Sequence, residues 1–333
     1  MSAAQTEQVQ VMDGSMGRLI FDMGVPRDTA LWSARALVDE QYHSVVVEAH
    51  AQYIRAGSKM ITTNNYGVQP QYYRKAFGDE WEKHARTSTA TAVRLAREAR
   101  TQCGAEGSVR ILGCLPPICE SHRPDLTAKM METDGREFCV NFYRMTVEEL
   151  IAGGVDALIA ETMNNWTEVE LVLEAVGQRM PLIVSMEGAL RSDDMTPMPA
   201  QRAPEVAKQV LAAVAAGSKI EALGFNCASP EHILAALVAL KDAGLTEELR
   251  KAGVQLATYA NINDNQELYD TGFDLEKFAE KVKDRRKDLV GSGHLVWCNR
   301  FMAAGATYCG GCCGTVPDQI RELAESLKSS EKA

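Results

Sequence analysis

The amino-acid sequence predicts an α/β fold, a (β/α)₈ barrel in a single domain, and three observations predict it. Short apolar runs of β-strand character alternate eight times with longer segments whose apolar residues recur at helical spacing. The alternation runs through the chain without a long linker, as a barrel of repeated strand–helix units requires. The length of 333 residues also suits one barrel, which typically takes about 250 residues and grows by insertions.

The predicted strands recur along the whole chain. They are expected at residues 9–14, 58–64, 108–115, 155–162, 181–188, 219–227, 254–261 and 306–313. A doubly wound open sheet is the alternative arrangement of alternating strands and helices. The sequence favours the barrel because no G-x-G-x-x-G fingerprint follows the first strand.

The predicted helices occupy the intervals between these strands. They are expected at residues 39–56, 80–102, 135–152, 167–178, 202–216, 229–243, 274–287 and 316–327. Ser229 followed by Pro230 places a capping residue before a proline at the first helical position. Other helices end at a glycine that follows the last periodic residue, as in the segments IRAGS and AAVAAGS.

Two polar stretches are predicted to be long loops within one domain. They are residues 187–205, after the fifth strand, and residues 260–274, after the seventh. We expect a polar N-terminal extension at 1–8, the barrel at 9–328 and a charged, frayed tail at 329–333.

The composition excludes several classes of protein. The net charge of −10 argues against nucleic acid and anionic membranes as partners, since both attract basic surfaces. No apolar run reaches the ~18 residues of a membrane span, and the polar start of the chain lacks the apolar core of a signal peptide. Nine cysteines are an odd number in a chain without an export signal, so we expect a reduced, cytoplasmic protein.

Reactive side chains are expected where the predicted strands end, because active sites of this fold lie at the C-terminal ends of barrel strands. The unusual residues at such ends are Asp13, Glu161, Cys227, Cys312 and Cys313. The sixth and eighth strands are separated by one strand in a closed barrel, so the three cysteines face the same mouth. Neighbouring strand residues point to opposite faces, so adjacent cysteines share a target only if the backbone leaves strand geometry, which the surrounding glycines permit.

Three thiolates on one centre suit zinc, and three protein ligands leave a fourth position open, as in catalytic zinc sites. Two other interpretations of these cysteines stay open. Buried cysteine is often only a small apolar core residue, which is our expectation for the other six of the chain. A vicinal disulfide or a redox-sensing pair is the rival functional interpretation of the GGCCGT segment at 310–315.

Several motifs, taken together, resemble the homocysteine S-methyltransferase family. They are VMDGSMG (11–17), EAHAQYIRAGSKMITTNNYG (48–67), GVDALIAET (154–162), GFNC (224–227) and GATYCGGCCGTVPDQI (305–320). The resemblance extends from Met12 to about Leu327. The family includes S-methylmethionine-dependent enzymes, betaine–homocysteine methyltransferase and the homocysteine domain of cobalamin-dependent methionine synthase. Its fold is a (β/α)₈ TIM barrel, in agreement with the strand pattern.

The resemblance implies a role for each residue at the predicted mouth. Cys227, Cys312 and Cys313 would be the zinc ligands, and the homocysteine thiolate would take the open position. Glu161 would hold the amino group of the substrate, and Asp13 would lie near the same ammonium. A metal-bound thiol is deprotonated outright, whereas a free thiol has a pKa near ~8.5, so zinc would supply a thiolate nucleophile without a general base.

The two acidic candidates could also have purely structural roles. Glu161 could cap the helix that begins near Trp166, and Asp13 could be a turn residue before Gly14. None of the six histidines has ligand spacing with another, so none is assigned a role.

Further substrate-binding candidates lie beside the predicted strand ends. Thr63, Asn64 and Tyr66 follow the second strand, where asparagines also commonly form turns. Asn226 precedes a predicted zinc ligand, which it could tune through the second coordination shell, and Asn261 after the seventh strand is a candidate of the same kind.

The methyl donor is predicted by exclusion. One barrel has no room for separate folate and cobalamin domains, which leaves a small onium compound unless a second corrinoid protein delivers the methyl group. We expect a sulfonium because its leaving group is a neutral thioether: S-methylmethionine first, then S-adenosylmethionine, with betaine behind. Selenocysteine as the acceptor is an alternative, and a cysteine-based redox or zinc sensor is the non-enzymatic one. We expect a monomer or homodimer.

Overall fold

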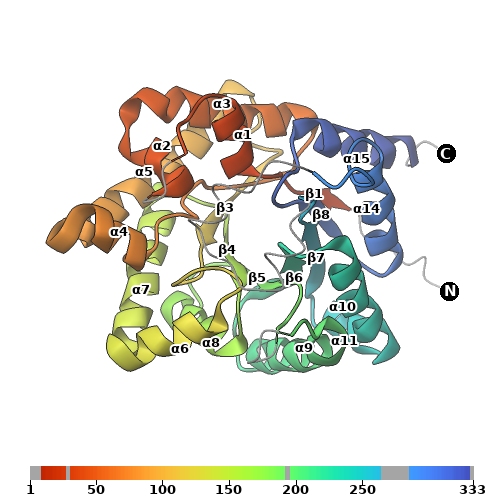
Figure 1. Cartoon of the computed structure of the whole chain (residues 1–333). Coiled ribbons are helices and arrows are strands. Elements are labelled where there is room, and N and C mark those ends of the chain that lie inside the picture. The colour runs from red at the N-terminus through yellow and green to blue at the C-terminus, as the bar shows by residue number, and fades with distance from the viewer. Residues whose placement is uncertain (1–8, 28–30, 192–195, 264–284, 331–333) are drawn as a thin grey trace.

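The structure, a computed structural model, describes residues 9–27, 31–191, 196–263 and 285–330. It confirms the predicted fold, because eight parallel strands form one nearly closed barrel surrounded by helices (Figure 1). The strands are β1 Gln10–Val11, β2 Met60–Thr62, β3 Arg110–Leu115, β4 Ala157–Met163, β5 Leu182–Glu187, β6 Ile220–Asn226, β7 Gln255–Ala260 and β8 Tyr308–Gly311. Each lies within a predicted strand or within one residue of it.

The strands are arranged around the barrel in chain order. The hydrogen-bonded sheet runs β1-β8-β7-β6-β5-β4-β3-β2, and a parallel bridge between Met12 and Met60 joins its two ends. Because all strands are parallel, their C-terminal ends lie at one end of the barrel, which we call the mouth. The N-terminal ends lie at the other end, which we call the base. Functional side chains are expected at the mouth.

The helices form the outer layer (Figure 1). They are α1 Met16–Asp22, α2 Arg35–Val38, α3 His43–Ala56, α4 Pro70–Phe77, α5 Trp81–Gln102, α6 Pro124–Thr133, α7 Arg136–Gly153, α8 Trp166–Val176, α9 Pro199–Ala215, α10 Pro230–Asp242, α11 Leu245–Lys251, α14 Gly293–Ala303 and α15 Pro317–Ser330. No described helix is both long and apolar enough to cross a bilayer.

The predicted helices correspond to α3, α5, α7, α8, α9, α10 and α15, except for residues 274–287. That prediction falls mainly on residues 264–284, which lie outside the described part of the chain. Residues 1–8 and 331–333 lie outside it as well, so the predicted extension and tail stay predictions.

The sequence prediction missed short helices such as α1, α4, α6, α11 and α14. It was also wrong to extend the loop after β5 to residue 205, because α9 begins at Pro199. The three prolines of this segment, Pro197, Pro199 and Pro204, suggest a loop. Pro199 occupies the first turn of the helix, where its missing N–H costs no hydrogen bond, and Pro204 lies inside the helix.

The barrel interior is filled by its own small core. Side chains such as Met60, Leu112, Ile159 and Ile183 pack there, and a second, larger core lies between the strands and the helices. The base is joined by an ion pair between β3 and β6, in which Arg110 and Glu221 lie 2.9 Å apart. The interior is therefore a packed core, and a cavity for ligands lies at the mouth.

Candidate metal centre and substrate cavity

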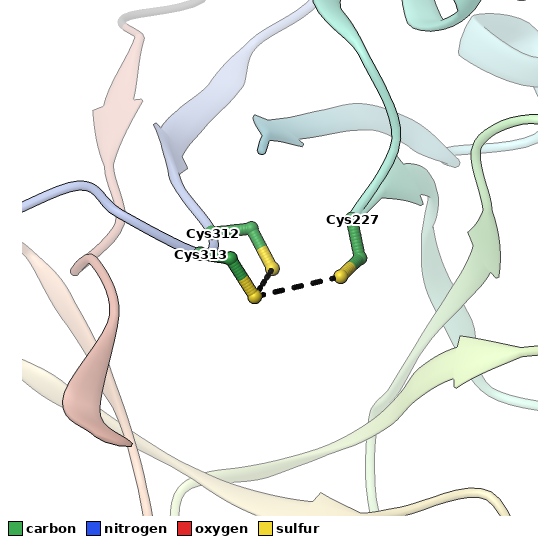
Figure 2. A group of neighbouring side chains, drawn as sticks. All are labelled: Cys227, Cys312 and Cys313. Carbon is green, nitrogen blue, oxygen red and sulfur yellow. Dashed lines mark hydrogen bonds between the residues drawn. The ribbon is translucent and has the colours of Figure 1, made fainter. Parts of the chain in front are cut away.

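Three cysteine side chains meet at the mouth. Cys227 directly follows β6, and Cys312 and Cys313 directly follow β8. Figure 2 shows the three sulfurs pointing toward one another. The Sγ atoms of Cys227 and Cys313 are 3.8 Å apart, those of Cys312 and Cys313 are 4.0 Å apart, and all three lie within 4.8 Å of one another. A cluster of this kind offers three ligands to a single metal ion.

The backbone leaves strand geometry to bring these sulfurs together. Cys227 adopts the left-handed region with a φ of 52°, and Gly314 does so with a φ of 85°. The amide of Thr315 donates to the carbonyl oxygen of Cys312 over 3.1 Å, which closes a turn around the two adjacent cysteines. Any Cβ at Gly310 would lie 2.6 Å from the Cβ of Met12, so only glycine lets β8 approach β1 this closely.

The three thiols are electrostatically unequal. The pKa of Cys313 lies well below its ordinary value, because Cys227 and then Cys312 donate hydrogen bonds to its sulfur, with smaller contributions from His122 and the side chain of Asn261. Burial opposes this shift. Of the three thiols, Cys313 therefore loses its proton most readily, beside two neighbouring thiols.

A cavity of about 120 Å³ lies beside the sulfurs and contains both predicted acids. The Asp13 carboxylate accepts a hydrogen bond from the amide of Thr62 over 2.8 Å. Burial raises the pKa of Asp13 to about 8 despite this bond, and the nearby Glu161 carboxylate contributes to the rise. Of the described residues that line the cavity, none is lysine or arginine. A cationic ligand would therefore meet carboxyls that lack a fixed basic partner in the cavity wall.

Glu161 lies on β4 and contacts a thiol of the neighbouring strand. The Sγ of Cys114 donates to its Oε2 over 3.3 Å, and burial raises the pKa of Glu161 to about 7. Glu161 does not cap the following helix, because Asn165 holds that position and accepts from the amide of Glu168 over 3.0 Å. The capping alternative is therefore wrong.

Thr63, Asn64 and Tyr66 all line the cavity, but they make different contacts. The Thr63 hydroxyl donates to Asn65 over 2.6 Å and accepts from the amide of Cys114 over 2.9 Å. The Asn64 amide donates to a backbone carbonyl over 3.3 Å. Tyr66 presents its ring, and its hydroxyl hydrogen-bonds that of Ser121. Thr63 and Asn64 thus mainly hold the loop after β2.

Asn226 and Asn261 lie behind the cavity wall. Asn226 accepts from Ser185 over 2.8 Å and donates to Thr162 over 2.7 Å, so it ties β6 to β5 and β4 one residue before Cys227. The Asn261 side chain accepts from the amide of Asn263 over 2.8 Å. These contacts brace the cysteine-bearing backbone.

Sequence reasoning missed several residues of the wall. The structure adds the cavity-lining side chains of Trp32, Tyr72, Glu120, His122 and Tyr259. Tyr66 therefore shares the described cavity lining with Trp32, Tyr72 and Tyr259. Tyr259 ends a predicted strand, so the rule that selected Asp13 would have found it. The other four lie in loops or helix starts that carry no signal of this kind.

A comparison with known proteins agrees with the chemistry of this site. The family model described as Homocysteine S-methyltransferase matches residues 10–327, nearly the whole chain. This match makes the protein a methyltransferase. The chain belongs to the homocysteine S-methyltransferase family, as the motifs around its cysteines indicated.

Individual relatives agree with this assignment. A homocysteine S-methyltransferase of Escherichia coli is 27% identical over 331 residues, which cover 95% of this chain and 94% of the relative. A selenocysteine Se-methyltransferase of Brassica oleracea is 24% identical, with 98% and 90% coverage. The metallated form of the homocysteine methyltransferase MmuM from Escherichia coli superposes with a TM-score of 0.67 at 26% identity, over 96% of this chain and 97% of that one.

Proposed function

We propose that this enzyme transfers a methyl group from a small onium donor, a sulfonium by preference, to the thiolate of L-homocysteine held at a zinc centre, and so forms methionine. The observation that carries the proposal is one cavity that joins three convergent cysteines, two acids and an aromatic wall.

The cysteine cluster fits zinc. A tetrahedral zinc site with Zn–S bonds of ~2.3 Å places its sulfurs about 3.8 Å apart. The sulfur–sulfur distances of 3.8 and 4.0 Å are close to that value. Cys227, Cys312 and Cys313 would hold the ion and leave one position open to the substrate sulfur. When bound, zinc would keep that sulfur deprotonated at neutral pH.

Glu161 and Asp13 suit the ammonium of homocysteine. Asp13 is buried and Glu161 partly buried, and desolvation raises the pKa of Glu161 to about 7 and that of Asp13 to about 8. An ammonium between them would favour their ionised forms and would gain charge-assisted hydrogen bonds of ~1.5–3 kcal/mol each. The substrate would then be fixed at one end by the acids and at the other by its sulfur.

The aromatic wall suits a methyl donor with a positive charge. The Trp32 and Tyr66 rings meet edge to face with centroids 5.9 Å apart, and Tyr72 and Glu120 lie in the same lining. Aromatic faces and nearby carboxylates attract sulfonium and quaternary ammonium groups. The substrate thiolate attacks the methyl carbon, and the bond from that carbon to the onium atom breaks with its electron pair. Opposite charges are neutralised in this step, and a sulfonium leaves as a neutral thioether.

Selenocysteine is a second candidate acceptor. The relative from Brassica oleracea that is described as a selenocysteine Se-methyltransferase supports it. A thiolate-rich zinc centre would accept selenium as well as sulfur. Homocysteine stays first because the matching family model is described by that substrate.

The test is a donor panel measured on the reduced, zinc-loaded protein. Homocysteine is offered with S-methylmethionine, S-adenosylmethionine, betaine or a methylcorrinoid, and methionine is quantified. We expect the highest kcat/KM with S-methylmethionine and loss of turnover after chelation of about one zinc per chain. Highest kcat/KM with betaine or the corrinoid would overturn the sulfonium assignment. Absence of turnover with every donor, together with reversible cysteine oxidation, would favour the sensor alternative.

A further inference from the structure

We propose that a buried trio, His122, Glu187 and Arg191, is a specificity-determining brace that positions the donor-facing wall of the cavity. The inference rests on the proposed function, since that function supplies the onium donor. It concerns side chains for which no role in binding the metal or homocysteine was proposed above, although His122 also contributes to the lowered pKa of Cys313.

The trio ties two loops of the mouth together. Glu187 is the last residue of β5, and its Oε1 lies 2.9 Å from Nδ1 of His122, in the loop between β3 and α6. Its Oε2 lies 4.0 Å from Nε of Arg191, in the loop after β5. Each of the three residues is only 2% exposed. The loop after β3 is thereby fastened to β5, past the intervening strand β4.

Stability alone does not explain why a carboxylate, a guanidinium and an imidazole are buried together at this place. Burial would raise the pKa of Glu187, but His122 and Arg191 outweigh it and hold the pKa below its ordinary value, so the carboxylate is ionised. Burying paired charges brings little net stability, and apolar residues of similar volume often serve as well. We therefore infer that these buried polar side chains are needed to hold the loops of the mouth in position.

Backbone strain marks the same region. His122 has a φ of 61°, a left-handed conformation that is uncommon outside glycine. The described non-glycine residues with positive φ are Trp32, His122, Thr162, Leu190 and Cys227. All of them except Leu190 line the cavity, and Leu190 directly precedes Arg191. Strain of this sort persists only where neighbouring contacts hold it, and it concentrates at binding sites.

A short series of contacts connects the trio to the aromatic side chains of the cavity wall. Ser121, next to His122, hydrogen-bonds through its hydroxyl to that of Tyr66, and the Tyr66 ring packs edge to face on Trp32. On its other side the loop is held by Asn164, which accepts from the amide of Arg123 over 3.2 Å. Release of His122 would free one side of this loop and shift the Tyr66 ring, which lies where a donor cation would contact it.

The first test compares two Glu→Gln variants at opposite ends of the barrel. Glu187→Gln removes the charge that holds His122, and Glu221→Gln removes the charge of the ion pair at the base. We expect Glu187→Gln to raise KM for the methyl donor about tenfold or more, as loss of a charge-assisted contact implies, with KM for homocysteine within about twofold. Zinc content stays unchanged. Glu221→Gln should move neither KM.

A second pair of variants keeps the inference testable if one protein fails to fold. His122→Asn retains an N–H donor and tolerates positive φ, whereas His122→Ala does neither. The Asn variant should recover most of the donor KM that the Ala variant loses. Equal rises of both KM values, an unchanged donor KM, or Asn no better than Ala would overturn the brace while the proposed function stands. A wild-type protein without turnover on any onium donor would overturn the proposed function and the brace with it.

Discussion

The mouth and the base of this barrel treat charge in opposite ways. At the base, Arg110 and Glu221 pair over 2.9 Å and remain partly exposed, with side-chain exposures of 35% and 22%, and Thr307 donates to Gln255 over 2.7 Å. At the mouth, Asp13 and Glu161 line a cavity whose described lining lacks lysine and arginine. The Arg110–Glu221 pair at the base satisfies its charges internally, whereas Asp13 and Glu161 at the mouth are left for a ligand to satisfy, unlike the paired Glu187 at the same end.

This difference separates stability from function within one fold. A buried acid without a fixed cation destabilises the unliganded protein, and left-handed non-glycine residues add strain at the same end. Both costs fall at the mouth, next to the cysteine cluster. Substitutions at the mouth should therefore change activity strongly and can increase stability, while substitutions at the base should change stability alone.

The largest effect is expected from the cysteine cluster. Replacing Cys227, Cys312 or Cys313 by alanine should lower turnover at least ~10²-fold and reduce the zinc content, since ligand loss exceeds the effect of losing an outer-shell partner. The melting transition should persist, because the barrel has a large core of its own. Cys139→Ala, a buried cysteine of α7 distant from the cluster in sequence, is the control. Full activity in a cluster variant would remove that residue from the ligand set.

A smaller effect is expected at the acids. Glu161→Gln should raise KM for homocysteine about ten- to hundredfold through loss of a charge-assisted contact, with zinc content unchanged. The matched substitution at the base, Glu221→Gln, should leave this KM as it is. Steady-state kinetics with varied homocysteine checks both, and an unchanged KM in Glu161→Gln would contradict the ammonium-binding role.

The same variant should be more stable than the wild-type protein when no ligand is bound. Because burial raises the pKa of Glu161 from 4.5 to about 7, the native state binds more protons than the unfolded chain between these values, and the free energy of unfolding falls as pH rises through this window. Glu161→Gln has no carboxyl to ionise, so its free energy of unfolding does not fall for this reason. It should gain up to about 3 kcal/mol at pH 8 and almost nothing at pH 4, as thermal unfolding at the two pH values would show. A gain independent of pH would exclude this cause.

The smallest effect is expected at the base. Removing the Arg110–Glu221 pair by Glu221→Gln should lower the free energy of unfolding by about 1 kcal/mol or less, because partly exposed pairs contribute little. Chemical denaturation with and without added salt measures it. A loss of activity in this variant would contradict the conclusion that substitutions at the base affect stability alone.

The sequence predicted what depends on periodicity and chain order. All eight strands could be placed, and the ends of β1, β4, β6 and β8 identified Asp13, Glu161 and the cysteines that the structure brings to the mouth. It did not predict contacts made by loops. His122 and Glu187 are 65 positions apart (187 − 122), and neither position carries a pattern that pairs them. Glu187 does end a predicted strand, so the strand-end rule could have selected it but could not have supplied its partner.

The closure of the barrel depends on a side chain assigned to the substrate. Strand β1 is only two residues long, and its connection to β2 includes the bridge between Met12 and Met60, a backbone bond from the Lys59 amide to the Val11 carbonyl and the bond from the Thr62 amide to the Asp13 carboxylate. That carboxylate occupies the place that a backbone carbonyl would take in a longer strand. The β1–β2 seam is therefore a place where the barrel could open locally, and we expect occupancy of the cavity to slow hydrogen exchange at the Thr62 amide. Substrate binding and completion of the β-barrel would then be one event.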